Sequence, residues 1–131
     1  MVKLQSGEEH QRKAWELLCE VSRVEYFKIY ERLDIQLKEV GESFYNPMLK
    51  DTVKDLLDRK VAEVNEGASC IFTKASKTPM IVQKSDGGFG YDATDMAAIN
   101  YRVNTIGADK ICYVTDISQE LHFKMLFAAA Q

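Results

Sequence analysis

Apolar residues recur at helical spacing in the first third of the chain. Positions three or four apart carry the apolar side chains Ala14, Leu17, Leu18, Val21 and Val24. This period predicts one long helix from about residue 7 to about residue 33. Ser6 followed by Glu9 has the pattern of a capping box at its start. We expect the aromatic side chains of this helix to pack in a core: Trp15, Tyr26, Phe27 and Tyr30.

Shorter apolar runs in the middle of the chain predict strands. The four predicted strands cover residues 35–40, 61–64, 70–73 and 80–83. The second and third flank Asn65-Glu66-Gly67-Ala68 and therefore look like a β-hairpin. Between the first two strands, Asn46-Pro47 predicts a helix that continues to about residue 60, because Asn is a good cap and Pro fits a first turn.

The last part of the chain predicts a strand–helix–strand unit. Asp86-Gly87-Gly88 indicates a tight hairpin turn. A helix capped by Asp92 or Thr94 then runs to Gly107, followed by a buried strand over residues 110–115 and a helix capped by Ser118. Such a unit is right-handed and places its strands in a parallel sheet. The expected fold class is therefore α/β.

Size and composition narrow the function classes. A length of 131 residues suits one domain, and we see no boundary within it. The net charge of −3, with acids and bases interleaved, disfavours a main docking surface for nucleic acid. No metal-ligand cluster is apparent, since the three cysteines and two histidines are far apart, and Cys112 lies in an apolar run typical of a buried thiol. The absence of a long apolar run leads us to expect a cytoplasmic protein.

Two polar segments are predicted to meet at one crevice. Tyr91–Asp95 and Asp116–Gln119 each follow a predicted strand, and ligands of such sheets bind beyond the strands' carboxyl ends. In one interpretation Asp92 or Asp95 caps the helix while Tyr91 packs on the sheet. In the other, one carboxylate pairs with a guanidinium and the phenol ring lies alongside.

Three further polar residues also have two interpretations. Glu42 is either a solvated loop carboxylate or a ligand-binding acid in a turn after a strand. Gln119 and His122 are three positions apart and share one face of a helix's first turn. They are either ordinary polar residues of the helix or part of the crevice. No nucleophilic Ser or Cys accompanies the histidine in a triad pattern, so hydrolase chemistry has no support.

Four segments of the chain carry a resemblance to a known family. They read AWELLCEVSRVEYFKIYERLDI, GESFYNPMLKDTVKDLL, IVQKSDGGFGYDATDMAAINYR and ADKICYVTDISQELHF. From about residue 11 to its end the chain resembles arginyl-tRNA synthetase, a class I aminoacyl-tRNA synthetase. The resemblance implies a Rossmann-like partial parallel sheet with flanking helices, a β-hairpin and a long N-terminal helix.

The same resemblance implies roles for five residues. Glu42 of the GES turn and Asp95 of the YxxxD segment would contact the arginine guanidinium. Tyr91 would lie against the substrate side chain, and Gln119 would border the pocket for the amino acid and adenylate. His122 is assigned to nucleotide binding. None of the five is expected to be catalytic in the sense of forming a covalent intermediate.

Two signature elements of the family have no counterpart in this sequence. Neither an HxGH motif nor a KMSKS-type loop is present. We therefore expect residues 1–131 to be one segment of the catalytic domain, the second half of its nucleotide-binding fold. The parent enzyme would use arginine, ATP with Mg²⁺, and tRNA, whereas the chain alone would be inactive. The alternative is a stand-alone, non-catalytic binding or interaction module. Self-association through an exposed sheet edge is also expected.

Overall fold

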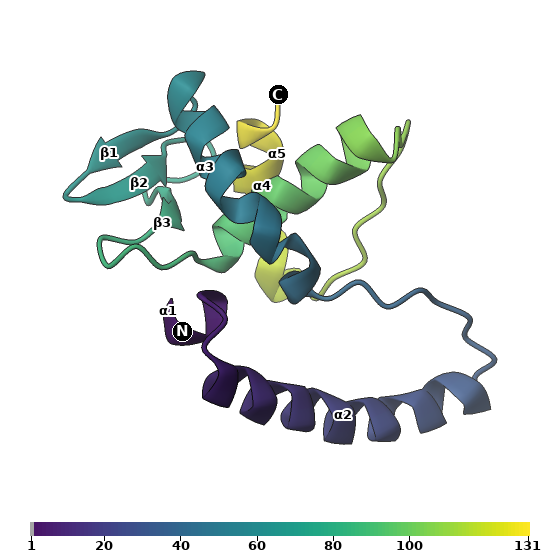
Figure 1. Ribbon diagram of the computed structural model, residues 1–131. Coiled ribbons are helices and arrows are strands. Elements are labelled where there is room, and N and C mark those ends of the chain that lie inside the picture. The colour runs from purple at the N-terminus through teal and green to yellow at the C-terminus, as the bar shows by residue number, and fades with distance from the viewer. Residues whose placement is uncertain (1) are drawn as a thin grey trace. The chain divides into compact units, whose positions relative to one another are not determined.

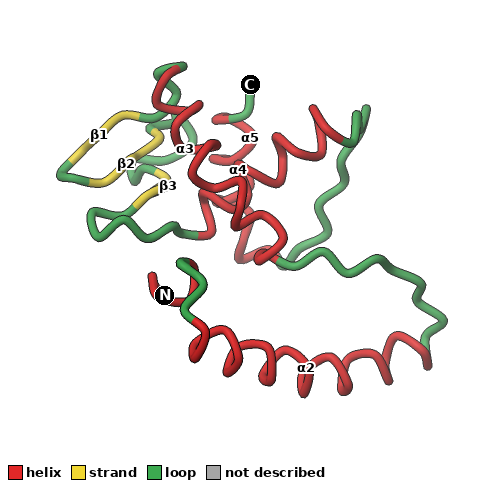
Figure 2. Tube along the Cα trace, viewed as in Figure 1, coloured by secondary structure: helices red, strands yellow, loops and turns green. Residues whose placement is uncertain are grey.

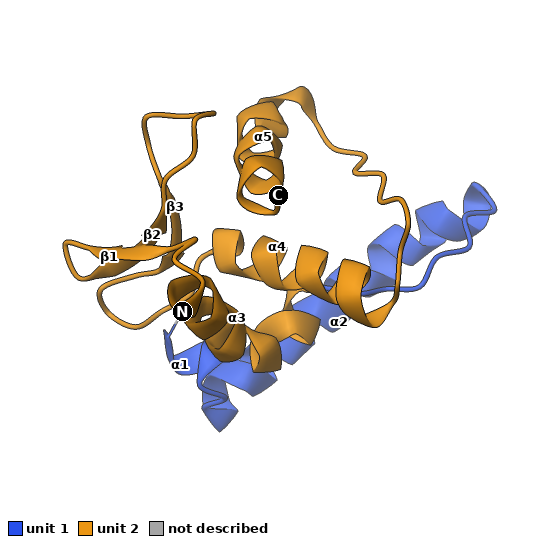
Figure 3. Ribbon diagram, turned by 90° about the horizontal axis from the view of Figure 1, so that it is seen from above, with its two compact units in different colours: residues 1–41 blue, residues 42–131 orange. Residues whose placement is uncertain are grey.

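The chain divides into two units in the computed structural model, which describes residues 2–131. One unit extends to Gly41, and the other comprises residues 42–131 (Figures 1 and 3). All residues that the sequence places at the candidate site belong to the second unit.

The first unit consists of two helices and an extended segment. Helix α1 comprises Val2–Gln5 and helix α2 comprises Glu9–Arg32, so the predicted long helix is confirmed (Figure 1). The capping box is wrong, because the hydroxyl of Ser6 donates a hydrogen bond back to the carbonyl of Lys3 at 3.0 Å. Glu8 precedes α2 and makes no capping bond with its side chain.

Helix α2 has no buried residue, so the predicted core packing of its aromatic side chains is wrong. Leu17 and Leu18 are 66% and 69% exposed. The rings of Tyr26, Phe27 and Tyr30 instead contact one another in tilted and edge-on arrangements, with centroids 5.5 to 5.8 Å apart. Ion pairs one turn apart, such as Lys13–Glu9, support the polar face.

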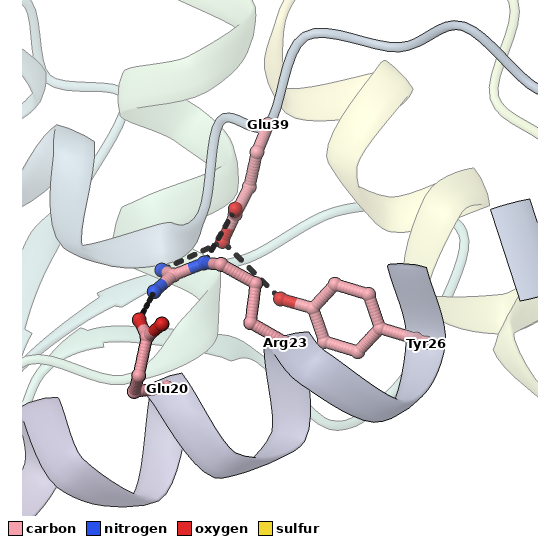
Figure 4. Close-up of polar contacts among 4 residues, drawn as sticks. All are labelled: Glu20, Arg23, Tyr26 and Glu39. Atoms are coloured by element: carbon pink, nitrogen blue, oxygen red, sulfur yellow. Dashed lines mark hydrogen bonds and ion pairs between the residues drawn. The ribbon is translucent and has the colours of Figure 1, made fainter. Parts of the chain in front are cut away.

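The segment that follows α2 is extended but is not the predicted strand. Residues 35–40 have no hydrogen-bonded neighbouring strand in the described part of the chain (Figure 2). The segment is attached to α2 by Arg23, whose Nε and Nη2 donate to the two oxygens of Glu39 at 2.8 and 3.1 Å (Figure 4). Glu20 and the hydroxyl of Tyr26 complete this polar cluster. The guanidinium holds the pKa of the Glu39 carboxyl below its ordinary value.

The second unit contains a three-stranded sheet of β1 (Glu63–Asn65), β2 (Ala68–Ile71) and β3 (Met80–Gln83). The strands pair antiparallel in the order β1-β2-β3, which confirms the predicted hairpin and the strand after it. The predicted turn after β3 is also confirmed. Gly87 has φ +83°, a conformation that favours glycine, and the N–H of Lys84 bonds the carbonyl of Gly88 at 2.8 Å.

The rest of the second unit is mainly helical. Their bounds are Glu42–Met48 (3₁₀), Leu49–Asp58 (α3), Tyr91–Asn100 (α4), Tyr101–Thr105 (a π turn continuing α4), Ile117–Gln119 (3₁₀) and Glu120–Ala129 (α5). Side chains from α3, α4, α5 and the sheet share one core, whose largest fully buried members are Leu49, Ile71, Met80, Leu126 and Val82. No helix within residues 2–131 combines the length and apolarity needed to cross a membrane.

Three helix starts differ from the sequence-based expectation. Pro47 lies inside the 3₁₀ helix, and α3 begins only at Leu49. Gly90 precedes α4, so neither Asp92 nor Thr94 is its cap. The carboxylate of Asp116, and not Ser118, caps the last helical segment, since it accepts the Ser118 N–H at 2.9 Å.

The α/β class is confirmed, but residues 2–131 form no parallel pair of strands. Residues 110–115 are extended without strand partners, Val114 is 96% exposed, and Cys112 is exposed where a buried thiol was expected (Figure 2). The segment is held by Tyr113, whose ring packs on Phe123 and Phe127 of α5. An apolar sequence becomes a parallel strand only beside another strand, and none lies next to this segment.

Candidate functional site

The start of α4 is built against β3. Gly90 precedes the helix, and a Cβ there would lie 3.2 Å from the Ile81 carbonyl, which is tight for any larger residue. Asp92, in the first turn, accepts a hydrogen bond from the Ile81 N–H at 2.7 Å. A short linker and one side-chain bond therefore set the position of the first turn of α4 relative to the sheet.

Two carboxylates of α4 converge on one histidine of α5. Asp92 and Asp95 are three positions apart and so project from the same face of the helix. His122 Nε2 lies 2.6 Å from Asp95 Oδ2, and His122 Nδ1 lies 3.4 Å from Asp92 Oδ1. The first distance is that of a strong charge-assisted hydrogen bond, and the second is longer than a good one. Asp95 is therefore the main partner of His122.

The contacts of His122 with the two carboxylates are largely shielded from solvent, which strengthens their electrostatic attraction. The side chains of His122 and Asp92 are 14% and 13% exposed, whereas that of Asp95 is 31% exposed. Burial raises the pKa of the Asp92 carboxyl above its ordinary value, opposed by the Ile81 N–H bond and by attraction to His122. Because a neutral imidazole has one donor and one acceptor, both nitrogens can donate to ionised carboxylates only in the imidazolium form.

An aromatic ring borders the cluster. Tyr91 is 62% exposed, and its ring lies edge-on to the His122 ring with centroids 4.9 Å apart. Phe123 also contacts the His122 ring, at 5.1 Å. Tyr91 and the partly exposed Asp95 thus offer solvent an aromatic surface and a carboxylate side by side. Such a pair suits a cation, above all a planar one.

The structure brings together three of the five residues singled out from the sequence, Tyr91, Asp95 and His122. Glu42 begins the 3₁₀ helix and is exposed, and Gln119 precedes α5 and is exposed. Within the described residues, no hydrogen bond or ion pair connects either side chain to the cluster. The 3₁₀ helix of Glu42 packs through Phe44 on Tyr101, beyond the last residue of α4.

Sequence reasoning missed the structural role of Asp92. It was considered as a helix cap, whereas its carboxylate joins α4 both to the backbone of β3 and to His122. The spacing of Asp92 and Asp95 was the available signal, because carboxylates three residues apart share a helix face. Their common partner lies 27 residues beyond Asp95 and could not be read from local spacing.

Two hollows on the surface of this unit lie away from the cluster. One of about 270 Å³ and another of about 410 Å³ adjoin each other beside α3 and the second half of α4, sharing Thr52, Asp55, Arg59 and Asn100. Neither is lined by Tyr91, Asp95 or His122. Recognition of a charged ligand depends on oriented hydrogen-bonding groups, which the cluster of Tyr91, Asp95 and His122 supplies.

Comparisons with known proteins decide the family. The model of the class I tRNA synthetase (R) catalytic domain matches residues 1–131. The chain belongs to this family. It is 50% identical to an arginine–tRNA ligase of Crocosphaera subtropica and 47% identical to the cytoplasmic arginine–tRNA ligase of Arabidopsis thaliana, in each case over the whole chain. The crystal structure of arginyl-tRNA synthetase from Plasmodium falciparum matches 96% of the chain with a TM-score of 0.84 and 46% identity.

The chain spans about a quarter of the length of these relatives. It covers 23% of the Crocosphaera protein and 22% of both the Arabidopsis protein and the Plasmodium chain. The likeness extends to residue 1, beyond the start at about residue 11 inferred from the quoted segments. The match to the Plasmodium structure confirms the expected synthetase fold for this stretch.

Proposed function

We propose that this chain forms the arginine-binding part of an arginine–tRNA ligase, within the catalytic domain that charges tRNA with arginine at the expense of ATP. The single observation that carries the proposal is the convergence of Tyr91, Asp95 and His122 at the start of α4. A partly exposed carboxylate beside an exposed phenol ring matches what a guanidinium requires.

Four residues are proposed as arginine contacts. Asp95 accepts from the guanidinium, Tyr91 covers its plane, Glu42 supplies a second acid, and Gln119 borders the backbone of the substrate. Guanidinium donates hydrogen bonds in a rigid fork, whereas the ammonium of lysine is a point charge. Two fixed acceptors therefore favour arginine over lysine, and a site built for such bonds rejects analogues that cannot make them.

ATP is proposed as the second substrate on family membership alone. Among residues 2–131 no group of three or more His, Cys, Asp or Glu side chains is arranged to hold a metal ion. The protein's contribution in this segment is positioning of the amino acid and electrostatic stabilisation. We also propose a cytosolic location, as for the cytoplasmic Arabidopsis relative, although another Arabidopsis relative, 46% identical, is chloroplastic/mitochondrial. Cell fractionation tests this location.

Arginine binding by the 131-residue chain tests the proposal. We expect arginine to shift the backbone amide signals of Tyr91 and Asp95 in nuclear magnetic resonance spectra, with lysine and citrulline causing much weaker changes at equal concentration. Asp95→Asn should weaken binding about tenfold, a loss of about 1.4 kcal/mol. Asp109→Asn is the matched control, since Asp109 is exposed and outside the cluster. Equal responses to arginine and lysine, or unchanged binding by Asp95→Asn, would contradict the proposal.

A further inference from the structure

His122 lies between two carboxylates that come from a different helix. It projects from the first turn of α5, while Asp92 and Asp95 project from α4, and α5 crosses α4 in the second unit (Figures 1 and 3). Its side chain is only 14% exposed. A ring so placed has little access to a nucleotide in solvent, but it has direct access to Asp95.

The contact with Asp95 orients one oxygen of that carboxylate. His122 Nε2 lies 2.6 Å from Asp95 Oδ2, and the carboxylate is 31% exposed. An ionised carboxylate only accepts hydrogen bonds, so this contact requires the ring proton on Nε2. A free aspartate side chain rotates about two bonds, and fixing it on binding would cost conformational entropy. The contact with His122 restricts the carboxylate plane, and among residues 2–131 no hydrogen bond or ion pair engages Asp95 Oδ1. Groups held before the ligand arrives bind it more tightly.

The position of His122 is itself held from several directions. Its Nδ1 faces Asp92, whose other oxygen accepts from the Ile81 N–H of β3. Its ring makes edge-type contacts with the rings of Tyr91 and Phe123. The chain of contacts therefore runs from the backbone of β3 through Asp92 and His122 to Asp95.

We propose that His122 is a positioning residue that holds the Asp95 carboxylate ready for the arginine guanidinium and ties α5 to α4. This role differs from the nucleotide contact that family resemblance implies for His122. The inference rests on the proposed function, because it assumes that Asp95 accepts from arginine. His122 acts through Asp95 and makes no contact with the guanidinium.

Two amide substitutions separate the two nitrogens of the ring. The side-chain nitrogen of glutamine in His122→Gln can occupy the place of Nε2 and still donate to Asp95. The shorter asparagine in His122→Asn reaches only the place of Nδ1, on the Asp92 side. Both variants lack the imidazole ring, and both new side chains are polar and uncharged. A difference in affinity between them therefore reports which ring nitrogen matters, and not the loss of the ring itself.

The test measures arginine affinity of the full chain and the two variants by nuclear magnetic resonance titration, with thermal unfolding of each as the folding control. We expect His122→Gln to bind within about threefold of the unsubstituted chain and His122→Asn to bind about tenfold more weakly, at similar melting temperatures. In the unsubstituted chain, nitrogen shifts of the ring should show a proton on Nε2.

Each other outcome overturns a defined part of the scheme. Unchanged affinity in His122→Asn, or equal losses in both variants, overturns the positioning role and leaves the arginine site standing. If the unsubstituted chain does not respond to arginine, the proposed function fails and the inference fails with it. A ring protonated only at Nδ1 overturns the inference without any ligand. If His122→Asn unfolds, the ring shifts of the unsubstituted chain and the affinity of His122→Gln decide the question.

Discussion

Asp92 on α4 accepts a hydrogen bond from the backbone N–H of Ile81 on β3, at 2.7 Å. Ile81 lies in the strand at one edge of the sheet, where an N–H would otherwise face water or another chain. One carboxylate thus covers part of the strand edge and sets where α4 begins. Its other oxygen faces His122 at 3.4 Å, so the same residue supports both the sheet and the proposed site.

Removing the Asp92 acceptor should destabilise the second unit. We expect Asp92→Ala to lower the free energy of unfolding by about 1 kcal/mol, because the Ile81 N–H loses its partner. Asp92→Asn keeps a carbonyl oxygen that can accept from the Ile81 N–H. Its loss in free energy of unfolding should be less than half that of Asp92→Ala. Urea unfolding followed by circular dichroism measures both. Equal losses in the two variants would show that the hydrogen bond is not the cause.

The raised pKa of Asp92 predicts a definite pH dependence. Because the pKa in the folded chain lies above the ordinary value of 3.8, the fold favours the protonated carboxyl. This contribution to stability is complete below the unfolded pKa and is lost as the pH rises through the folded pKa. The stability of the unsubstituted chain relative to Asp92→Asn should therefore fall from about pH 3.8 upward and then level off.

The comparison is repeated in a His122→Gln background, where titration of the histidine contributes nothing. A relative stability that rises over the same pH range would contradict the assigned direction.

The Arg23–Glu39 pair in the first unit should protect the Arg23 Nε proton from exchange with solvent. Arg23 Nε–H donates to Glu39, and the pKa of Glu39 is lowered mainly by this bond (Figure 4). Its contribution is present above the unfolded pKa and is lost as the pH falls through the folded pKa. We expect Glu39→Gln to speed solvent exchange of the Arg23 Nε proton several-fold at neutral pH.

Glu31→Gln, on the same helix, is the control and should leave that exchange unchanged. Acidification below the ordinary Glu39 value of 4.5 should loosen the pair in the unsubstituted chain. Rapid exchange at neutral pH before any substitution would show that the pair does not persist in solution.

The 131-residue chain is expected to bind arginine without activating it. The proposed positioning residues Tyr91 and Asp95 lie in this chain, but the sequence has neither an HxGH motif nor a KMSKS-type loop to act on ATP phosphates. Arginine-dependent exchange of pyrophosphate into ATP should stay at background with the purified chain. A signal above background that disappears in Asp95→Asn would contradict this prediction while supporting the arginine site.

Self-association should proceed through the unpaired segment 110–115. Its backbone is extended without strand partners, and Val114 is 96% exposed, so it can pair with another chain. We expect sedimentation velocity to show a mass that rises with concentration, and Val114→Lys to suppress that rise. Leu17→Lys is the matched control, because Leu17 is 66% exposed and lies on helix α2, outside any strand. A monomer at every concentration would refute the prediction.

Local signals sufficed for the elements that local chemistry stabilises. The long helix, the β1–β2 hairpin, β3 and the glycine turn at Gly87 all follow from residue spacing and backbone preference. Family resemblance, carried by short segments of sequence, also pointed to Tyr91, Asp95 and His122. It could not show that Asp92 links β3 to His122, because that contact depends on how α4 and α5 pack.

Only the tertiary structure determined whether the apolar runs at residues 35–40 and 110–115 form strands. Both have strand-like sequences, yet a strand exists only where a second one supplies its hydrogen bonds, and residues 2–131 supply none there. The sequence by itself determined which segments are helical, which turn tightly and which residues carry charge. The packing of α5 on α4 decided which of those charges meet, because a contact between residues 27 positions apart arises only from long-range packing.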